Sequence, residues 1–543
     1  MTERIRIDDL HISIERRDDV VRAVDGVSLS LAGNEILALV GESGSGKTLT
    51  ARSALKLLPR GATTRGAVLV EGQDVLSVPG DTLRKIRGGH AAMVFQEPST
   101  ALNPVYTIGW QLEEGLRAHG IASRAERYAR GLQALRDVGI PEPERRYHDY
   151  PHQFSGGQKQ RIVIAMALSL KPGVIIADEP TTALDVTVQA EILDLLRKCR
   201  DELGTAIILI THNMGVVADL ADRVAVMYQG KVVETADVHS LFARPQHPYT
   251  RQLLASVPRF GQAVRPQRPP AADEPPVLRA EKLEITYPGR FRKPPFRAVR
   301  GVDFEVRKGE IFGLVGESGS GKSTIGRAIA GLTATSGGVL EFLGTDLRRA
   351  SRAEVQRLRR KLGFVFQDPA SSFNPFMSIA DCIAEPMRIH RVPAGKRGID
   401  ARVRELLEAV QLPSSFASRT PMELSGGQRQ RVGVARALAL KPEFVIADEP
   451  TSALDVSVQA TILRLLGELH EELGFAALFI THDLAVVEEF ADRVGVLKQG
   501  EFMEIAPAET LLKEARDPYT RALIDAVPIP DPVAQRAKRK RAV

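Results

Sequence analysis

Short apolar runs alternate with helix-like stretches through each half of the chain. In the first half, apolar runs of strand length predict buried strands at 35–40, 174–177 and 206–210. Apolar residues recurring every three or four positions predict helices at 47–58, 155–170 and 186–203. Apolar strands that alternate with helices indicate an α/β fold with a mainly parallel sheet covered on both faces. The stretch before Ser155 is richer in helix, which predicts a separate helical subdomain.

The same pattern starts again after a proline-rich break. Residues 259–276 contain five prolines and almost no apolar periodicity, which is typical of a semi-extended linker. Residues 277–287 then alternate apolar and polar positions, which predicts an edge strand. We therefore expect a first domain at 1–258, a second domain at 277–530, and a basic C-terminal tail at 531–543.

Length and composition agree with two cytoplasmic domains. The chain of 543 residues is too long for one hydrophobic core. Its hydrophobic fraction of 43% and charged fraction of 26% are ordinary for a globular protein. No secretory segment and no apolar run of membrane-spanning length occur, so membrane contact is expected only through partners. The two cysteines, Cys199 and Cys382, form no zinc spacing or disulfide framework, as in a reducing compartment.

The net charge of +6 is modest for this length. The basic cluster at 538–541 is compatible with contact to anionic lipid or nucleic acid. A solvated tail is the simpler interpretation of such a terminal cluster.

A glycine-rich octamer occurs twice, 275 residues apart, each time between a predicted strand and a predicted helix. Glycines let the backbone curl so that several N–H groups point at phosphate oxygens, and the helix N-terminus adds its positive end. The lysine would reach the β- and γ-phosphates, and the next hydroxyl would serve Mg²⁺. Two nucleotide sites are therefore predicted. The octamers are Gly41, Glu42, Ser43, Gly44, Ser45, Gly46, Lys47 and Thr48, and Gly316, Glu317, Ser318, Gly319, Ser320, Gly321, Lys322 and Ser323.

An acidic pair closes an apolar strand in each half, 270 residues apart: Asp178-Glu179 and Asp448-Glu449. The aspartate suits a role at Mg²⁺, and the glutamate suits polarising an attacking water. Such a pair is weak evidence alone, but both are followed by Pro-Thr-(Thr/Ser)-Ala-Leu-Asp. The repeated context favours a catalytic function.

A histidine follows a later strand in each half, within Ile-Thr-His at His212 and His482. A lone histidine at such a place is more often structural. Its recurrence in register with the acidic pairs favours a role in the reaction.

A second anion-binding motif opens a helix in each half. A serine hydroxyl, two small residues and a helix N-terminus suit a phosphate group. Each half would then carry two phosphate-binding ends, more than one nucleotide needs, which predicts a head-to-tail pair of halves with each nucleotide clamped between them. The motifs are Ser155, Gly156, Gly157 and Gln158, and Ser425, Gly426, Gly427 and Gln428.

Together these motifs resemble the ATP-binding cassette (ABC) superfamily over nearly the whole chain. The resemblance implies two tandem P-loop NTPase domains that close on ATP as an intramolecular head-to-tail pseudo-dimer and reopen on hydrolysis. Glu179 and Glu449 would be general bases, and His212 and His482 would steady the γ-phosphate. The Q-loop glutamines Gln96 and Gln367 would join Thr48, Asp178, Ser323 and Asp448 at Mg²⁺, and Asp185 and Asp455 would be the D-loop aspartates.

A narrower resemblance is to the oligopeptide/dipeptide/nickel importers, whose fused two-cassette members include glutathione and microcin C importers. It rests on the Q-loop regions at 95–104 and 366–375 and on His-Pro-Tyr-Thr-Arg at 247–251 and Asp-Pro-Tyr-Thr-Arg at 517–521. It implies two transmembrane permease subunits and an extracytoplasmic solute-binding protein as partners, with no nucleic acid. The chain would lie on the cytoplasmic face of the inner membrane, peripheral to it.

The two halves also depart from the family pattern in different places. Tyr287 matches the aromatic residue that stacks on adenine, whereas its counterpart in the first half is Ile14. The first signature has Phe154 where leucine is usual. We expect asymmetric nucleotide affinity but hydrolysis at both sites, because each keeps its glutamate and histidine.

The alternative is a soluble tandem-cassette ATPase that acts on ribosomes or nucleic acid. Ribosome-associated cassettes usually carry a long charged helical segment between halves, and the DNA-repair and ribosome-recycling types carry zinc or iron–sulfur cysteines. This chain has a short proline-rich join and two cysteines.

Peptide is the expected substrate, with nickel, opines and peptide antibiotics left open.

Overall fold

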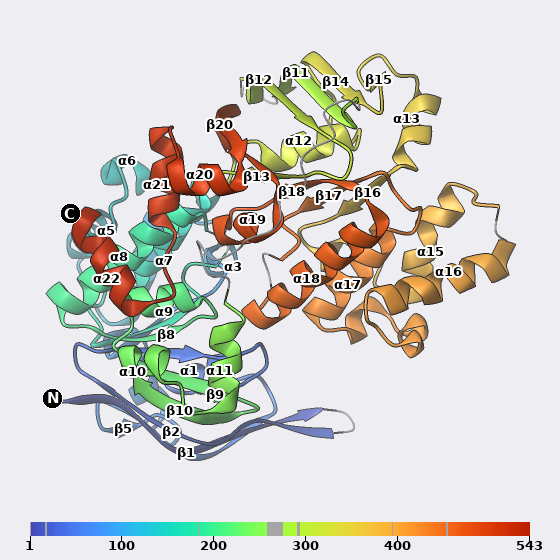
Figure 1. Cartoon of the computed structure of the whole chain (residues 1–543). Helices are drawn as coiled ribbons and strands as arrows, with labels where there is room; N and C mark the ends of the chain where they lie inside the picture. The colour runs from blue at the N-terminus through green and yellow to red at the C-terminus, as the bar shows by residue number, and fades with distance from the viewer. Residues whose placement is uncertain are drawn as a thin grey trace. The chain divides into compact units, whose positions relative to one another are not determined.

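The computed structural model describes residues 2–16, 19–182, 184–257, 275–289, 294–393, 395–451 and 454–542 (Figure 1). The chain forms two compact units. Unit 1 comprises residues 1–184, 188–257 and 528–543, and unit 2 comprises residues 185–187 and 258–527. The predicted linker at 259–276 lies, up to residue 274, outside the described residues.

The main sheet of unit 1 has six strands in the order β10-β9-β3-β8-β7-β6. Every neighbouring pair is parallel except β9 and β10, so the predicted mainly parallel sheet is confirmed. The strands of unit 1 are β1 (Glu3–Arg16), β2 (Asp19–Ala32), β3 (Ile36–Val40), β4 (Ala62–Val70), β5 (Gln73–Asp74), β6 (Ala91–Val94), β7 (Val174–Asp178), β8 (Ala206–Ile210), β9 (Arg223–Tyr228) and β10 (Lys231–Asp237).

Helices and a second sheet cover the two faces of this main sheet. Along β7, Val174 and Ile176 pack with the second sheet and the first helix, whereas Ile175 and Ala177 pack with the helical layer on the other face. This alternation follows from the two-residue period of a strand. The helices of unit 1 are α1 (Lys47–Ser53), α2 (Gly80–Gly89), α3 (Pro98–Ala101), α4 (Ile108–Ala118), α5 (Arg124–Asp137), α6 (Pro143–Arg146), η1 (Pro151–Gln153), α7 (Gly156–Leu168), α8 (Val186–Leu203), α9 (Met214–Leu220), α10 (Val238–Ala243), α11 (Pro248–Ala255) and α22 (Pro532–Ala542).

The helix predicted at 47–58 is shorter than expected and ends at Ser53. Lys56 has a positive φ of 50°, and the N–H of Leu57 donates to the carbonyl of Arg52 at 3.0 Å. A residue in the left-handed conformation after the last turn, together with this hydrogen bond, ends the helix there.

A four-stranded antiparallel sheet, β2-β1-β4-β5, accompanies the main sheet, and its equivalent in unit 2 is β12-β11-β14-β15. The prediction that residues 277–287 form an edge strand is wrong, because β11 (Leu278–Tyr287) pairs with both β12 and β14. Leu278, Ala280, Leu283 and Ile285 are buried in one core cluster. Alternating apolar and polar residues indicate that one face of an antiparallel sheet is buried. The alternation does not indicate whether the strand pairs on one side or on both.

Unit 2 repeats the architecture of unit 1, with a six-stranded sheet in the order β16-β17-β18-β13-β19-β20. Its remaining strands are β12 (Phe296–Val306), β13 (Ile311–Val315), β14 (Gly337–Phe342), β15 (Thr345–Asp346), β16 (Leu362–Val365), β17 (Phe444–Asp448), β18 (Ala476–Ile480), β19 (Arg493–Lys498) and β20 (Glu501–Pro507). Its helices are α12 (Lys322–Ile329), α13 (Arg352–Arg359), α14 (Pro369–Ser372), α15 (Ile379–Ile389), α16 (Gly395–Ala409), η2 (Ser414–Ser418), η3 (Pro421–Glu423), α17 (Gly426–Ala437), α18 (Val456–Leu473), α19 (Leu484–Phe490), α20 (Ala508–Glu514) and α21 (Pro518–Ala526).

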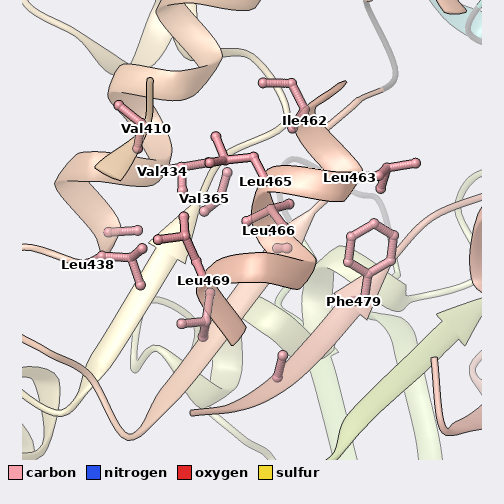
Figure 2. Packing of buried hydrophobic residues seen from close by; sticks show 14 of the residues in the cluster. Val365, Val410, Val434, Leu438, Ile462, Leu463, Leu465, Leu466, Leu469 and Phe479 are labelled. Carbon is pink, nitrogen blue, oxygen red and sulfur yellow. The ribbon is translucent and has the colours of Figure 1, made fainter. Parts of the chain in front are cut away.

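The helical layer of unit 2 is tied to its sheet by one apolar core. Figure 2 shows Leu465, Leu466 and Leu469 of α18 gathered with residues of α17, and Phe479 of β18 beside them. The predicted helical subdomain corresponds to α3–α6 in unit 1 and to α14–α16 with η2 in unit 2. Among the described residues, no helix has both the length and the apolar character needed to cross a membrane.

Candidate functional site

The phosphate loop of unit 1 connects β3 to α1, and its lysine donates hydrogen bonds back to the loop. The Nζ of Lys47 donates to the carbonyls of Gly41 and Glu42, both at 2.7 Å. Gly46 caps the helix with φ 98°, and a Cβ there would lie 2.6 Å from the carbonyl oxygen of Ala23. A side chain at this position would therefore be both strained and obstructed.

The loop of unit 2 is built in the same way between β13 and α12. The Nζ of Lys322 donates to the carbonyls of Gly316 at 2.7 Å and Glu317 at 2.8 Å. Burial lowers the pKa of Lys322 more than the nearby carboxylates raise it. In both loops the lysine therefore rests on backbone oxygens that it can exchange for phosphate oxygens.

The aspartate that ends the strand beside each loop is joined to the loop hydroxyl. Asp178 accepts a hydrogen bond from Thr48 at 3.1 Å, and Asp448 accepts one from Ser323 at 2.8 Å. Burial raises the pKa of both aspartates. A hydroxyl and a carboxylate side by side are oxygen ligands of the kind that Mg²⁺ takes next to nucleotide phosphates. The donor set therefore fits this ion.

Glu179 directly follows Asp178 and is oriented by three side chains. Its Oε2 accepts hydrogen bonds from Gln96 and Thr182, each at 2.8 Å, and its Oε1 lies 3.2 Å from Nδ1 of His212. Burial acts to raise the pKa of Glu179, but the hydrogen bonds from His212 and Thr182 and the charges of His212 and Lys47 together outweigh burial, so its pKa lies below the usual value. The backbone of Glu179 has φ 48°, a sparsely populated conformation of the kind that gathers at functional sites.

Glu449 repeats this arrangement in unit 2, with φ 46°. Its Oε2 accepts from Gln367 at 2.8 Å, and its Oε1 lies 3.3 Å from Nδ1 of His482. Burial acts to lower the pKa of His482, but the contact with Glu449 outweighs burial and raises it. Each unit thus holds a glutamate, a glutamine and a histidine in one hydrogen-bonded cluster.

The Ser-Gly-Gly motifs lie at helix N-termini, as expected. Ser155 caps α7 and Ser425 caps α17, each accepting from the N–H of the glutamine three residues later at 3.3 Å. A Cβ on Gly157 would lie 2.3 Å from Cγ1 of Val188 in α8, whereas a Cβ on Gly156 would meet nothing within 4 Å. The second glycine is therefore required by helix packing, a role that its sequence motif does not indicate.

The other expected residues lie at the margins of these clusters. The hydroxyl of Tyr287, at the end of β11, is 3.3 Å from that of Thr324, and Ile14 lies in β1. Asp185 accepts a hydrogen bond from Thr187 at 2.8 Å, and Asp455 is the N-cap of α18.

Two contacts of the site were missed from the sequence. Thr182 donates a hydrogen bond to Glu179 at 2.8 Å, and Arg52 pairs with Asp178 at 3.2 Å. Arg327 occurs 275 residues after Arg52, and its charge acts on the pKa of Asp448. The offset of the phosphate loops was the signal that would have identified this pair of arginines.

In each unit the phosphate loop, the aspartate, the glutamate, the glutamine and the histidine gather at the carboxyl ends of the parallel strands, where α/β sheets bind ligands. This arrangement defines a nucleotide-hydrolysing P-loop ATPase site, present twice.

Comparison with known proteins identifies the family. The ABC transporter family matches residues 24–182 and 299–452, and the C-terminal region of oligopeptide/dipeptide transporters matches residues 233–284 and 503–543. The chain is similar to the glutathione import ATP-binding protein GsiA of Escherichia coli K12, with 44% identity over 98% of this chain and 91% of the relative. GsiA of Shigella flexneri matches equally well, at 44% identity over the same shares.

Among solved structures, the ATP-binding cassette MJ0796 bound to ADP and Pi aligns at 32% identity, covering 42% of this chain and 98% of that one, with a TM-score of 0.40. CbiO1 from Clostridium perfringens aligns at 28% identity, covering 44% of this chain and 92% of that one, also with a TM-score of 0.40.

The chain belongs to the ABC transporter family. It is the ATP-hydrolysing subunit of an importer, with an ABC cassette and an oligopeptide/dipeptide-type C-terminal region in each half. The relatives favour this reading over the ribosomal or nucleic-acid alternative.

Proposed function

We propose that both sites hydrolyse ATP and that the oriented glutamate is the base in each. The observation that carries this proposal is the repeated cluster in which glutamine and histidine fix the two oxygens of Glu179 and Glu449. An ionised carboxylate held in this way is ready to accept a proton from an attacking water. Lys47 and Lys322 would exchange their carbonyl partners for phosphate oxygens.

The roles at Mg²⁺ follow from the same geometry. The hydroxyls of Thr48 and Ser323 and the carboxylates of Asp178 and Asp448 would supply oxygen ligands. Gln96 and Gln367 donate through their amide nitrogens to the glutamates, and their amide oxygens would be further ligands of the ion. When bound between these residues, Mg²⁺ would supply positive charge against the phosphates during transfer.

Each Ser-Gly-Gly motif would close on the nucleotide of the other cassette, which is the head-to-tail pairing that the family resemblance implies. Asp185 and Asp455 lie in the segments that would face the opposite cassette. The support for this arrangement is that each unit carries two separate helix N-termini of a kind that suits a phosphate group, at α1 and α7 and at α12 and α17.

The transported solute is proposed to be a short peptide, with glutathione as the first candidate. Support comes from the relatives that import glutathione and from the oligopeptide/dipeptide region in both halves. The chain would associate with two permease subunits at the cytoplasmic face of the inner membrane, and an extracytoplasmic solute-binding protein would deliver the solute.

The proposal is tested by reconstituting the chain with its permease in vesicles and adding the solute-binding protein. ATP turnover and uptake of radiolabelled glutathione are measured for the wild type, Glu179→Gln and Glu449→Gln. Each single variant is expected to lose a large part of both activities, because each removes one of two bases. Unchanged turnover in Glu179→Gln together with abolished turnover in Glu449→Gln would refute hydrolysis at both sites. Stimulation by a dipeptide but not by glutathione would leave the ATPase intact and change only the solute.

A further inference from the structure

The last residues of the chain follow the second cassette in sequence but belong to the compact unit of the first. Residues 528–543 group with unit 1, and α22 packs on α9 and α10 (Figure 1). A solvated basic tail was expected here. Instead residues 532–542 form the helix α22, and two of its polar side chains share a partner elsewhere in unit 1.

That partner is Asp219, near the end of α9, whose side chain is only 8% exposed. Its carboxylate accepts from Arg197 of α8 at 2.8 Å, from Gln535 at 3.1 Å and from Arg539 at 3.3 Å. Gln535 and Arg539 are four residues apart and therefore lie on one face of α22. A buried carboxylate is stable only with several such partners.

The segment before α22 is also ordered against α9. A Cβ on Gly215, in the first turn of α9, would lie 2.6 Å from the carbonyl oxygen of Pro528, so only glycine leaves room for the chain there. Asp531 caps the helix by accepting from the N–H groups of Val533 at 2.8 Å and Ala534 at 3.0 Å. The contact is therefore built from both a fitted backbone and specific side chains.

The second cassette lacks the features that receive this segment. At the positions 270 residues later, Ala485 replaces Gly215, Gly467 replaces Arg197, and Glu489 in place of Asp219 is exposed. The docking surface is therefore particular to the first cassette, although the surrounding fold is repeated.

Helix α9 begins at Met214, two residues after His212. Asn213 caps it by accepting from the N–H groups of Gly215 at 2.9 Å and Val216 at 3.2 Å. His212 in turn lies 3.2 Å from Oε1 of Glu179. Whatever fixes α9 therefore fixes the histidine that orients the glutamate.

We infer that residues 528–542, through Gln535 and Arg539 on Asp219, are a positioning element of the first nucleotide site that holds His212 against Glu179. The inference rests on the proposed function, in which Glu179 acts as a base. The C-terminal segment, which follows the second cassette in sequence, would thus support the nucleotide site of the first cassette. Gln535 and Arg539 are positioning residues, since neither contacts Glu179 or His212.

The test uses the full chain with Gln535→Ala and Arg539→Ala combined. The matched control combines Arg536→Ala and Lys540→Ala, which remove exposed side chains from α22. Each pair is placed in a Glu449→Gln background, where turnover depends on Glu179, and in a Glu179→Gln background, where it depends on Glu449. In the first background the docking pair is expected to lower kcat roughly threefold to tenfold with little change in KM, because the phosphate loop is untouched. The control pair and the second background should show no change.

Hydrogen exchange along α9 is measured in the same variants and in a chain truncated after Val527. Faster exchange in α9, but not in α19, is expected in the docking pair and in the truncated chain, and an added peptide of residues 528–543 should restore protection and turnover. Unchanged exchange in α9, or an equal loss of kcat in both backgrounds, would overturn the inference. If Glu449→Gln alone abolished turnover, the proposed hydrolysis at the first site would fail, and the exchange data would still decide whether the segment docks on α9.

Discussion

Gly157 offers a stringent test of how the Ser-Gly-Gly motif works, because its crowded neighbour can be removed separately. A Cβ added at Gly157 would lie 2.3 Å from Cγ1 of Val188, well inside van der Waals contact. Both residues lie in helices, α7 and α8, so neither backbone yields easily. At Gly156 an added Cβ meets nothing within 4 Å, which provides a control one residue away.

The expected magnitude follows from two opposing effects. Replacing glycine by alanine inside a helix gains about 0.8–1 kcal/mol of helix propensity. Forcing a methyl group into a packed site costs about 1–3 kcal/mol. Gly156→Ala should therefore be neutral or slightly stabilising, whereas Gly157→Ala should destabilise unit 1 by about 0–2 kcal/mol net. Their difference, about 1–3 kcal/mol, corresponds to roughly 2–12 °C in the melting temperature of a unit of this size.

The assay is calorimetric melting of the full chain, with ATP turnover as a second readout. Val188→Ala removes the atom in the way, so the double variant Gly157→Ala/Val188→Ala should be more stable than the sum of the two single changes predicts by about 1 kcal/mol or more. Equal melting temperatures for Gly156→Ala and Gly157→Ala, or purely additive effects in the cycle, would refute the packing argument. Loss of turnover without loss of stability would instead assign the glycine to nucleotide contact alone.

Three further predictions concern the nucleotide sites. Asp178→Asn should lower the affinity of the first site for Mg²⁺ during ATP binding by about tenfold, because one charged oxygen ligand is lost. The affinity is measured by titrating Mg²⁺ against fluorescent ATP in a Glu449→Gln background. Because the pKa of His482 is raised in the folded protein from its ordinary value of 6.5, its protonated form stabilises unit 2 fully below pH 6.5, and this contribution fades as pH rises through the folded value. The melting difference between wild type and His482→Gln should therefore shrink on going from pH 6 to alkaline pH, and a constant difference would contradict the raised pKa. Tyr287→Ile should weaken nucleotide binding at the second site by about 1 kcal/mol, as judged by equilibrium titration, if the ring stacks on adenine as ring–base contacts commonly do.

The sequence predicted the elements whose signals are local. A buried strand, a glycine loop and a helix lie within twenty residues of one another, so the positions of β3 and α1 were predicted to within a few residues. The edge-strand prediction for β11 was wrong because strand pairing depends on residues far away in the sequence. Its partners β12 and β14 are set by pairings that an apolar alternation does not encode.

The candidate site divides in the same way. Glu179 and His212 were found because their motifs recur, and Gln96 was found through the resemblance to the ABC family. The structure brings them together although 83 and 33 residues separate the hydrogen-bonded pairs. Arg52 was missed because a single arginine in a helix has no local signal. The contact of Gln535 with Asp219 spans 316 residues, and nothing in either segment indicates the other.

Duplication of a cassette within one chain preserves the reaction but allows the surroundings of each site to differ. The loop lysines and the glutamine–glutamate contacts recur in both units, and each of those contacts is 2.8 Å long. The differences lie one layer further out, where Ile14 replaces the ring of Tyr287 and where Gly215 and Asp219 receive a helix that Ala485 and Glu489 do not. A substitution in that outer layer changes how firmly a site is held without removing a group that reacts. We therefore expect the two halves to perform the same chemical steps. They should differ in nucleotide affinity and in the rigidity of the helix that follows the histidine, which is α9 in unit 1 and α19 in unit 2.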